Sequence, residues 1–233
     1  RFYQLGFDEA AGNLQTDNFG RGGLGGDPLL GAVQYNAAIG PPVTGTIPAP
    51  DGTSPVVALG ICNAPNPDRD VSNEADVTLH ELTHTVTTRI IGDAAGLNFG
   101  PGQGMGEGWS DFFALSLLHG VQADDPNSQY PLAAYWQYRF FGTAFTANYV
   151  YGARRFPYST DNGVNPLTWA DADATTFDLS GGFIPSVVPL HPRDFVYEVH
   201  SFGEIWATTL WEMRSRIIAA NGGNVPVGNE ATM

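Results

Sequence analysis

The hydrophobic pattern of this chain changes after about residue 70. Residues 10–72 carry short apolar runs between clusters of Gly, Pro, Asn and Asp, so loops and turns are expected at Gly20–Pro28 and Gly40–Pro55. The β-branched run Pro55–Cys62 lies between turn signals and predicts a strand. We therefore expect a first part that is rich in loops and β-structure.

Helical spacing replaces this pattern in residues 72–92. Ser72 or Asn73 is expected to cap a helix there, and Gly92 is expected to end it. Threonines are indifferent helix formers, so burial rather than propensity must support this helix. Its apolar positions recur at helical intervals and are Leu79, Leu82, Val86 and Ile90.

Two further helices are predicted, one from about Gly104 to Gly120 and the longest from about Pro192 onward. Residues 121–190, which lie between them, are mixed, loop-rich and aromatic. The first residues read as the end of a helix, with Gly6 as its stop. Because position 1 is Arg and no signal-peptide pattern opens the chain, we expect the sequence to be a processed or trimmed part of a longer one.

Composition and charge exclude several classes of protein. With 42% hydrophobic residues the chain is too apolar to be disordered, and the absence of a long apolar run predicts no membrane span. The formal charge of −14 argues against nucleic acid as a partner. All ten basic residues are arginine. Cys62 is the only cysteine, so no intramolecular disulfide forms, and nothing nearby in sequence would activate it as a nucleophile.

The stretch LHELTHTV, Leu79–Val86, carries the clearest chemistry. Residues four apart lie on one face of a helix, so His80 and His84 can direct two imidazole nitrogens at one point. Glu81 lies beside the pair, within reach of a metal-bound water. This HExxH pattern is typical of zinc-dependent hydrolysis. The plainer interpretation is a pair of core histidines on a buried helix.

A catalytic zinc usually has three protein ligands, so a third is needed. Thr87 and Ile90 stand where the extended HExxHxxGxxH pattern needs Gly and His, which excludes the metzincins. Other candidates remain open, namely His119, His191, His200 and nearby acids. Among the acids, Glu107 stands between two glycines on the next predicted helix, and Asp111 follows one turn later on the same face. Such a pair can bind a metal and orient a ligating histidine.

The combination HELTHTVTTRI with GMGEGWSDFFAL resembles the gluzincin metallopeptidases, specifically the fungalysin-like (M36) peptidases. Three more stretches carry the resemblance across nearly the whole chain, and these are AAGNLQTDNFGRGGLGGDP, RRFPYSTDNGVNPLTW and VHSFGEIWATTLWE. The resemblance implies an α+β, thermolysin-like domain of two lobes with zinc in the cleft. The first lobe, residues 1–92, would be rich in loops and strands and would end in the HExxH helix. The second, residues 93–233, would be mainly helical and incomplete.

The same resemblance implies roles for individual residues. His80, His84 and Glu107 match the zinc ligands, and Glu81 matches the general base. Asp111 matches the acid that supports a ligand, and His200 matches the histidine that stabilises the tetrahedral intermediate. It further implies a secreted endopeptidase that is made with a propeptide and acts on proteins or peptides.

Several points stay open at this stage. No tyrosine lies between Leu82 and Glu107, where thermolysin-like enzymes commonly place a helper, so a second oxyanion donor is unassigned; Tyr151, Arg154 and Tyr158 are candidates. Calcium could bind at residues 123–128 or 169–178, although neither has a calcium-loop motif. The alternative function is a non-catalytic, zinc-stabilised scaffold or binding module, and an aminopeptidase with the same zinc triad is a third option.

Overall fold

The computed structural model describes residues 1–35, 44–63, 67–98, 100–119, 125, 128–135, 148–172 and 199–222. The strands are β1 (Leu30–Tyr35), β2 (Gly45–Ile47), β3 (Val56–Cys62) and β4 (Arg69–Asp70). The α-helices are α1 (Ala75–Ile90), α2 (Gly100–His119), α3 (Asn148–Tyr151) and α4 (Val199–Ala220). Short 3-10 turns lie at Glu9–Ala11, Val71–Asn73 and Trp169–Ala172. The predicted mixture of helix and strand is confirmed.

The small sheet is organised around β3, which is the predicted strand and is mostly buried. It pairs in parallel with β1 and antiparallel with β2, and its far end pairs antiparallel with β4. Three of these strands were not predicted: β1, the two-residue β4, and β2 inside the segment expected to be loops. β1 and β2 are poor strand signals, since β1 exposes nearly all its residues and β2 spans three residues. Pairing with β3 stabilises them where intrinsic preference does not.

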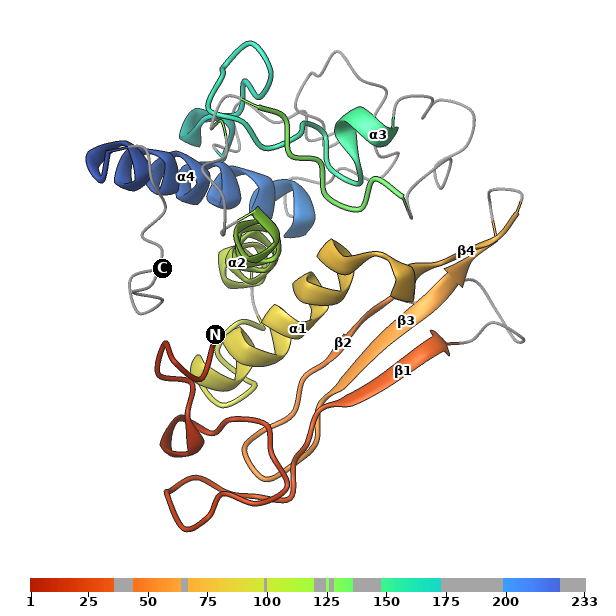
Figure 1. Ribbon diagram of the computed structural model, residues 1–233, viewed down its shortest axis with the longest axis vertical. Helices are drawn as coiled ribbons and strands as arrows, with labels where there is room; N and C mark the ends of the chain where they lie inside the picture. The colour runs from red at the N-terminus through yellow and green to blue at the C-terminus, as the bar shows by residue number, and fades with distance from the viewer. Residues whose placement is uncertain are drawn as a thin grey trace.

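Helix α1 lies between the sheet and α2, and α2 in turn packs against α4 (Figure 1). This central position changes the expected apolar face. Of the four predicted positions, Val86 is buried, Leu79 and Leu82 are half-buried, and Ile90 is 56% exposed. Because α1 is covered from two sides, its buried positions also include charged and polar groups, namely His80, Glu81, Thr83, Thr85, Thr87 and Arg89. The predicted stripe was therefore wrong in part.

The threonine hydroxyls of α1 donate hydrogen bonds to carbonyl oxygens of the same helix. Thr83 donates its hydroxyl proton to the carbonyl oxygen of Leu79 at 2.8 Å, and Thr85 donates to that of Leu82 at 2.7 Å. Such bonds to the preceding turn allow a hydroxyl to be buried without a loss of hydrogen bonding. Burial thus supports this helix, as expected.

The ends of the helices differ from the sequence expectations in detail. Ser72 and Asn73 do not cap α1, because they belong to a 3-10 turn that Asp70 caps; Glu74 is the N-cap and makes no side-chain capping bond. α1 ends at Ile90, and Gly92 follows with a φ of 70°. α2 starts four residues earlier than predicted, at Gly100.

The first residues and the last helix of the chain compare differently with the expectations from the sequence. The first residues form turns rather than the end of a helix, with the amide of Leu5 bonded to the carbonyl of Arg1 at 3.0 Å. The predicted helix in the last part is present from Val199, and residues 192–198 lie outside the described residues. No helix in the described part of the chain is both long and apolar enough to cross a membrane.

Arg89, at the C-terminal end of α1, holds the N-terminal loops against the helix. Its guanidinium donates to the carboxylate of Asp27 at 2.6 Å and to the carbonyl oxygens of Gly12 and Thr53 at 3.0 Å each. Both charged side chains are almost completely buried. A planar group with five donors in a fixed geometry can serve more acceptors at once than the three donors of a lysine. The loops of the first part are therefore fastened to the end of the helix that carries HExxH.

Candidate active site

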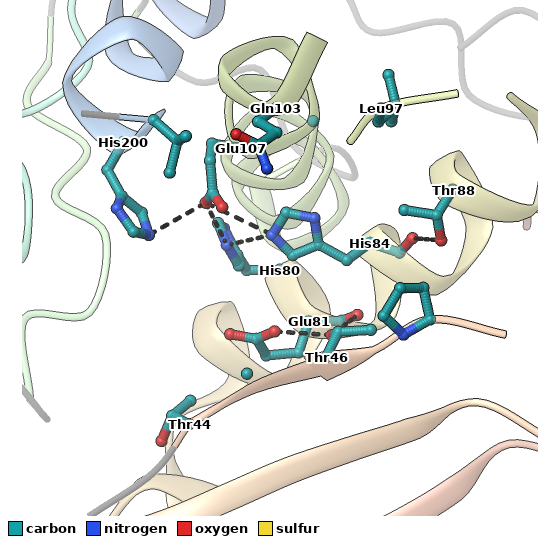
Figure 2. A pocket seen from close by; sticks show the side chains of 14 residues that line it. Thr44, Thr46, His80, Glu81, His84, Thr88, Leu97, Gln103, Glu107 and His200 are labelled. Atoms are coloured by element: carbon teal, nitrogen blue, oxygen red, sulfur yellow. Dashed lines mark hydrogen bonds and ion pairs between the residues drawn. The ribbon is translucent and has the colours of Figure 1, made fainter. Parts of the chain in front are cut away.

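A pocket of about 340 Å³ lies where the sheet, α1, α2 and α4 meet. Figure 2 shows its lining, with Thr44 and Thr46 from the strand side and the labelled histidines and acids from the helices. A volume of this size is at the low end of what small-ligand sites occupy. Of the six residues to which the family resemblance gives a role, Asp111 lies behind the pocket against His80, and the other five line it, namely His80, Glu81, His84, Glu107 and His200.

The three predicted metal ligands converge at one point. Ligand atoms of His80, His84 and Glu107 lie within 4.8 Å of one another, and this group is the one of its kind that the described residues form. The Nε2 atoms of the two histidines are 3.0 Å apart. Oε2 of Glu107 lies 3.2 Å from Nε2 of His80 and 3.5 Å from Nε2 of His84. The helical spacing of the histidines and the packing of α2 on α1 together create this geometry.

These atoms fit a divalent metal ion. Glu107 Oε2 is buried and makes no hydrogen bond of good geometry within the described part of the chain. An unsatisfied buried carboxylate oxygen that faces two imidazole nitrogens is costly unless a cation neutralises it. Two imidazoles and one carboxylate are also the ligand set of many catalytic zinc sites, where the fourth position stays open. The residues present therefore fit zinc.

Asp111 is in contact with His80, one layer behind the cluster. Its Oδ1 lies 2.7 Å from Nδ1 of His80, which leaves Nε2 of that ring directed at the pocket. Arg154 donates to Asp111 through Nε at 2.6 Å and through a terminal nitrogen at 2.8 Å. The hydroxyl of Tyr158 donates to the same carboxylate at 2.5 Å. Each side chain in this chain of contacts is at most 8% exposed, so its geometry is closely determined.

Charges around the cluster change several pKa values. Burial opposes the charged imidazole of His80, but the neighbouring carboxylates of Asp111 and Glu107 outweigh this and raise the pKa of His80 to about 10. Burial would raise the pKa of Glu107, yet the neighbouring His200 and His84 hold that pKa well below its usual range. Burial acts on Asp111 in the same way, and the Arg154 guanidinium holds the pKa of Asp111 far below normal.

Helix α4 approaches α2 closely enough to touch the cluster because of two glycines. A Cβ on Gly203 would lie 2.7 Å from the Cβ of Glu107, and a Cβ on Gly108 would lie 2.5 Å from the carbonyl oxygen of Gly203. Neither distance is sterically tolerable, so the approach requires glycine at both positions. It brings His200, at the start of α4, to 3.4 Å from Glu107 Oε2.

A second arginine holds α4 in place. Arg155 donates to the carboxylate of Glu204 at 2.6 Å and to the carbonyl oxygen of Ser201 at 2.6 Å. Its backbone N–H donates to Glu204 as well, at 2.8 Å. Arg155 and Glu204 are buried. The two adjacent arginines therefore bind different helices: Arg154 binds Asp111 of α2, and Arg155 binds α4.

The remaining candidates from the sequence lie elsewhere. His119, at the end of α2, stacks against Tyr130 with ring centroids 4.9 Å apart. His191 and most of both suggested calcium segments lie outside the described residues. Of the three proposed second donors, Arg154 and Tyr158 are bound to Asp111, and Tyr151 ends α3 half-buried. The second donor stays unassigned.

Two contributors were missed by the sequence reasoning. Thr46, on β2, donates its hydroxyl proton toward Glu81, with its Oγ 2.7 Å from Oε2 of the carboxylate. Nothing in the local sequence around Thr46 signals this, since β2 itself was not predicted. Arg155 has a signal in the sequence, because it stands next to Arg154 in an acidic chain that has ten arginines and no lysine. Arginine is the basic residue best suited to a buried ion pair with an acid, so adjacent arginines hint at such pairs.

Comparison with known proteins finds relatives across nearly the whole chain. The model of the fungalysin metallopeptidase (M36) family matches residues 1–232. Extracellular metalloproteinase 4 of Arthroderma otae is 34% identical over 227 residues, which cover 96% of this chain and 30% of that protein. Extracellular metalloproteinase MEP of Pyricularia oryzae is 35% identical over 228 residues, which cover 94% of this chain and 30% of that protein.

A third relative, extracellular metalloproteinase mep of Aspergillus terreus, is 33% identical over 230 residues, which cover 95% of this chain and 30% of that protein. The chain thus spans about 30% of the length of these relatives. The match of the family model covers almost every residue, including the HExxH helix and the acidic helix that follows it. This chain belongs to the fungalysin metallopeptidase (M36) family.

Proposed function

We propose that this chain carries the catalytic site of a secreted, zinc-dependent endopeptidase that hydrolyses proteins or peptides. The observation that carries the proposal is the convergence of His80, His84 and Glu107 in an open pocket that Glu81 also lines. A structural zinc site is normally closed by four protein ligands and needs no neighbouring base. Three ligands beside a glutamate therefore favour catalysis over the scaffold alternative.

In this proposal His80, His84 and Glu107 hold the zinc ion. A bound zinc ion would act as a Lewis acid and lower the pKa of an adjacent water molecule. Asp111 fixes the orientation of His80 through its 2.7 Å contact with Nδ1, so that Nε2 stays directed at the ion. Arg154 keeps Asp111 ionised and in place through its two hydrogen bonds.

The proton transfers fall to Glu81. Its carboxylate accepts a proton from the attacking water and returns it to the amine of the leaving group. A negative charge develops on the carbonyl oxygen of the substrate during attack, and a donor beside the pocket stabilises it. His200 is the proposed donor, because its ring lies 3.4 Å from Glu107 and its side chain is 45% exposed, hence accessible to substrate.

The proposal extends to the architecture and the location of the protein. We assign residues 1–92 to one lobe of a thermolysin-like fold and residues 93–233 to the other. The pocket supports this division, because Thr46 and Glu81 line it from the first part and Glu107 and His200 from the second. Secretion is supported by the relatives, which are named extracellular metalloproteinases. A propeptide is part of the same proposal.

The decisive experiment compares the protein with its Glu81→Gln variant in zinc content and in casein hydrolysis. We expect about one zinc ion per chain in both proteins, with hydrolysis lost in the variant alone, because Gln cannot accept the proton. Glu212→Gln is the matched control, since Glu212 lies on α4 and its one ion pair among the described residues is an exposed one with Arg216, at 3.7 Å.

Two results would contradict the proposal. Zinc binding with hydrolysis that survives Glu81→Gln would exclude Glu81 as the base. A folded protein that binds zinc without any hydrolysis would favour the scaffold, and a folded protein that takes up no zinc would exclude both.

A further inference from the structure

The general base of the proposed reaction has one side-chain partner in the described part of the chain, and it comes from the sheet. Thr46 Oγ lies 2.7 Å from Glu81 Oε2 and 2.8 Å from the backbone carbonyl oxygen of the same residue. Figure 2 shows the threonine side chain beside the glutamate, at the base of the pocket. Its hydroxyl has one proton for these two acceptors, so the proton bridges the carboxylate and the helix backbone.

Strand register determines that a threonine stands at this point. β2 pairs with β3 through Gly45 with Ala58, Thr46 with Val57 and Ile47 with Val56. Side chains alternate between the faces of a strand, so Thr46 faces away from the side that Gly45 and Ile47 share. A shift of the register by one residue would place Gly45 or Ile47 opposite Glu81. Neither has a side chain that can donate a hydrogen bond.

Glu81 is only 7% exposed, yet its carboxylate must be able to reach water in the pocket. A glutamate has rotatable bonds, and its base strength is useful only when one oxygen points at the reacting water. The hydrogen bond from Thr46 occupies Oε2 and leaves the other oxygen available. It also joins the short strand β2 to α1, so the wall of the pocket and the base are held by the same contact.

We propose that Thr46 is a positioning residue for the general base, which holds Oε2 of Glu81 so that its other oxygen faces the pocket. The inference rests on the proposed function, because it assigns Thr46 a role through Glu81. The hydrogen bonds of the Thr46 hydroxyl go to Glu81, so Thr46 would act through the base.

The test uses the full-length protein, loaded with zinc, and two substitutions at position 46. Thr46→Val removes the hydroxyl and keeps the β-branched shape, and Thr46→Ser keeps the hydroxyl. We expect Thr46→Val to lower kcat by roughly 10- to 100-fold, the range that a small misplacement of a catalytic group can cost. KM and zinc content should change less than about twofold, since neither substrate nor metal contacts are removed. Thr46→Ser should restore most of kcat.

A second measurement does not depend on activity. The unfolding midpoints of the metal-free protein, Thr46→Val, Glu81→Ala and the double variant form a double-mutant cycle. If the hydrogen bond exists, the decrease in unfolding midpoint of the double variant will differ from the sum of the decreases of the two single variants by about 2 °C or more. If Thr46→Val does not fold, Thr46→Ala against Thr46→Ser makes the same comparison of hydroxyl lost and hydroxyl kept.

The outcomes separate this inference from the proposed function. An active wild type whose Thr46→Val variant keeps kcat within about twofold would overturn the role of Thr46 and leave the endopeptidase intact. Equal losses of kcat in Thr46→Val and Thr46→Ser would also overturn it, since the hydroxyl would then be irrelevant. A wild type that binds zinc but hydrolyses nothing would overturn both.

Discussion

The two walls of the pocket are built in different ways. The helical wall, formed by His80 and His84 of α1 and Glu107 of α2, has further layers of support behind it, from Asp111 out to Arg154. The strand wall, residues 44–48 including β2, has three residues of sheet pairing and reaches Glu81 through one hydroxyl. The groups expected to hold a metal are thus supported by further layers of side chains. The Glu81 carboxylate, which is expected to move protons, has one side-chain hydrogen bond among the described residues.

This difference has a physical rationale. Metal ligands must be held in one geometry, because a small displacement of one ligand weakens binding. A base that takes up and releases a proton must be oriented but also able to change its contacts during the reaction. A buried layered network suits the first task, and a single hydrogen bond suits the second. The variants below test this contrast, from the largest expected effect to the smallest.

Loss of a ligand on the helical wall should have the largest effect. We expect Glu107→Ala to weaken zinc binding by more than roughly 100-fold. That factor is the upper range for removing a residue that only supports a metal ligand. The larger effect is expected because the metal loses its one carboxylate ligand in the cluster. Competition with a zinc chelator measures the change. Glu212→Ala on α4 is the control, and zinc binding by Glu107→Ala at the wild-type affinity would contradict the assigned ligand set.

Gly203 tests whether the helical wall depends on close helix contact. We expect Gly203→Ala to lower the free energy of unfolding by about 1–3 kcal/mol, the usual cost of overpacking a filled site. A Cβ there would lie 2.7 Å from the Cβ of Glu107. Chemical denaturation measures it. Gly102→Ala, on the same pair of helices, is the matched control, because its Cβ would meet other atoms only at 3.6 Å or beyond. Equal stability of the two variants would contradict the prediction.

The layer behind the ligands should matter less than the ligands themselves. We expect Asp111→Asn to weaken zinc binding by roughly 10- to 100-fold, because the support of His80 loses its charge. It should also destabilise the chain, since Arg154 is left buried without its carboxylate partner. Tyr158→Phe removes one hydrogen bond to Asp111 but keeps the charge, so its effect on the zinc Kd should be smaller. The reverse order would show that charge is not what supports His80.

The smallest effect, counted per pH unit, concerns pH. The pKa of His80 in the metal-free chain is raised to about 10 from 6.5, so a metal ion must displace a proton throughout this range. Zinc affinity should therefore rise by about tenfold per pH unit for each proton released. The stability of the metal-free chain should change in the opposite sense. Because the pKa of His80 is raised in the folded state, protonated His80 contributes its full stabilisation to the folded metal-free chain below pH 6.5. This contribution is lost as pH rises through about 10.

Zinc titrations and thermal unfolding between pH 6.5 and 10 check both trends. Zinc affinity that does not change across this range would contradict the raised pKa of His80. In the Asp111→Asn variant both trends should be weaker, because Asp111 is the first of the groups that raise this pKa.

The geometry of the candidate metal site was the most predictable part of the molecule. His80 and His84 are one helical turn apart, so their convergence follows from the period of the helix once α1 forms. Glu107 was suggested by its glycine neighbours and by the family resemblance, and the structure brings it to the two histidines. The boundaries of α1, by contrast, were predicted less well, because Asp70 and Ser72 form a competing turn ahead of the helix.

The sequence by itself therefore determined the parts of this protein that depend on short-range spacing: the pair of histidines, the glutamate between them, and the acidic helix that follows. It also determined membership of the family. Only the tertiary structure decided which groups support these side chains. The bond from Thr46 to Glu81 joins residues 35 positions apart, and the bond from Arg154 to Asp111 joins residues 43 positions apart. Helical periodicity relates residues within a few turns, whereas strand register and helix packing set these longer contacts.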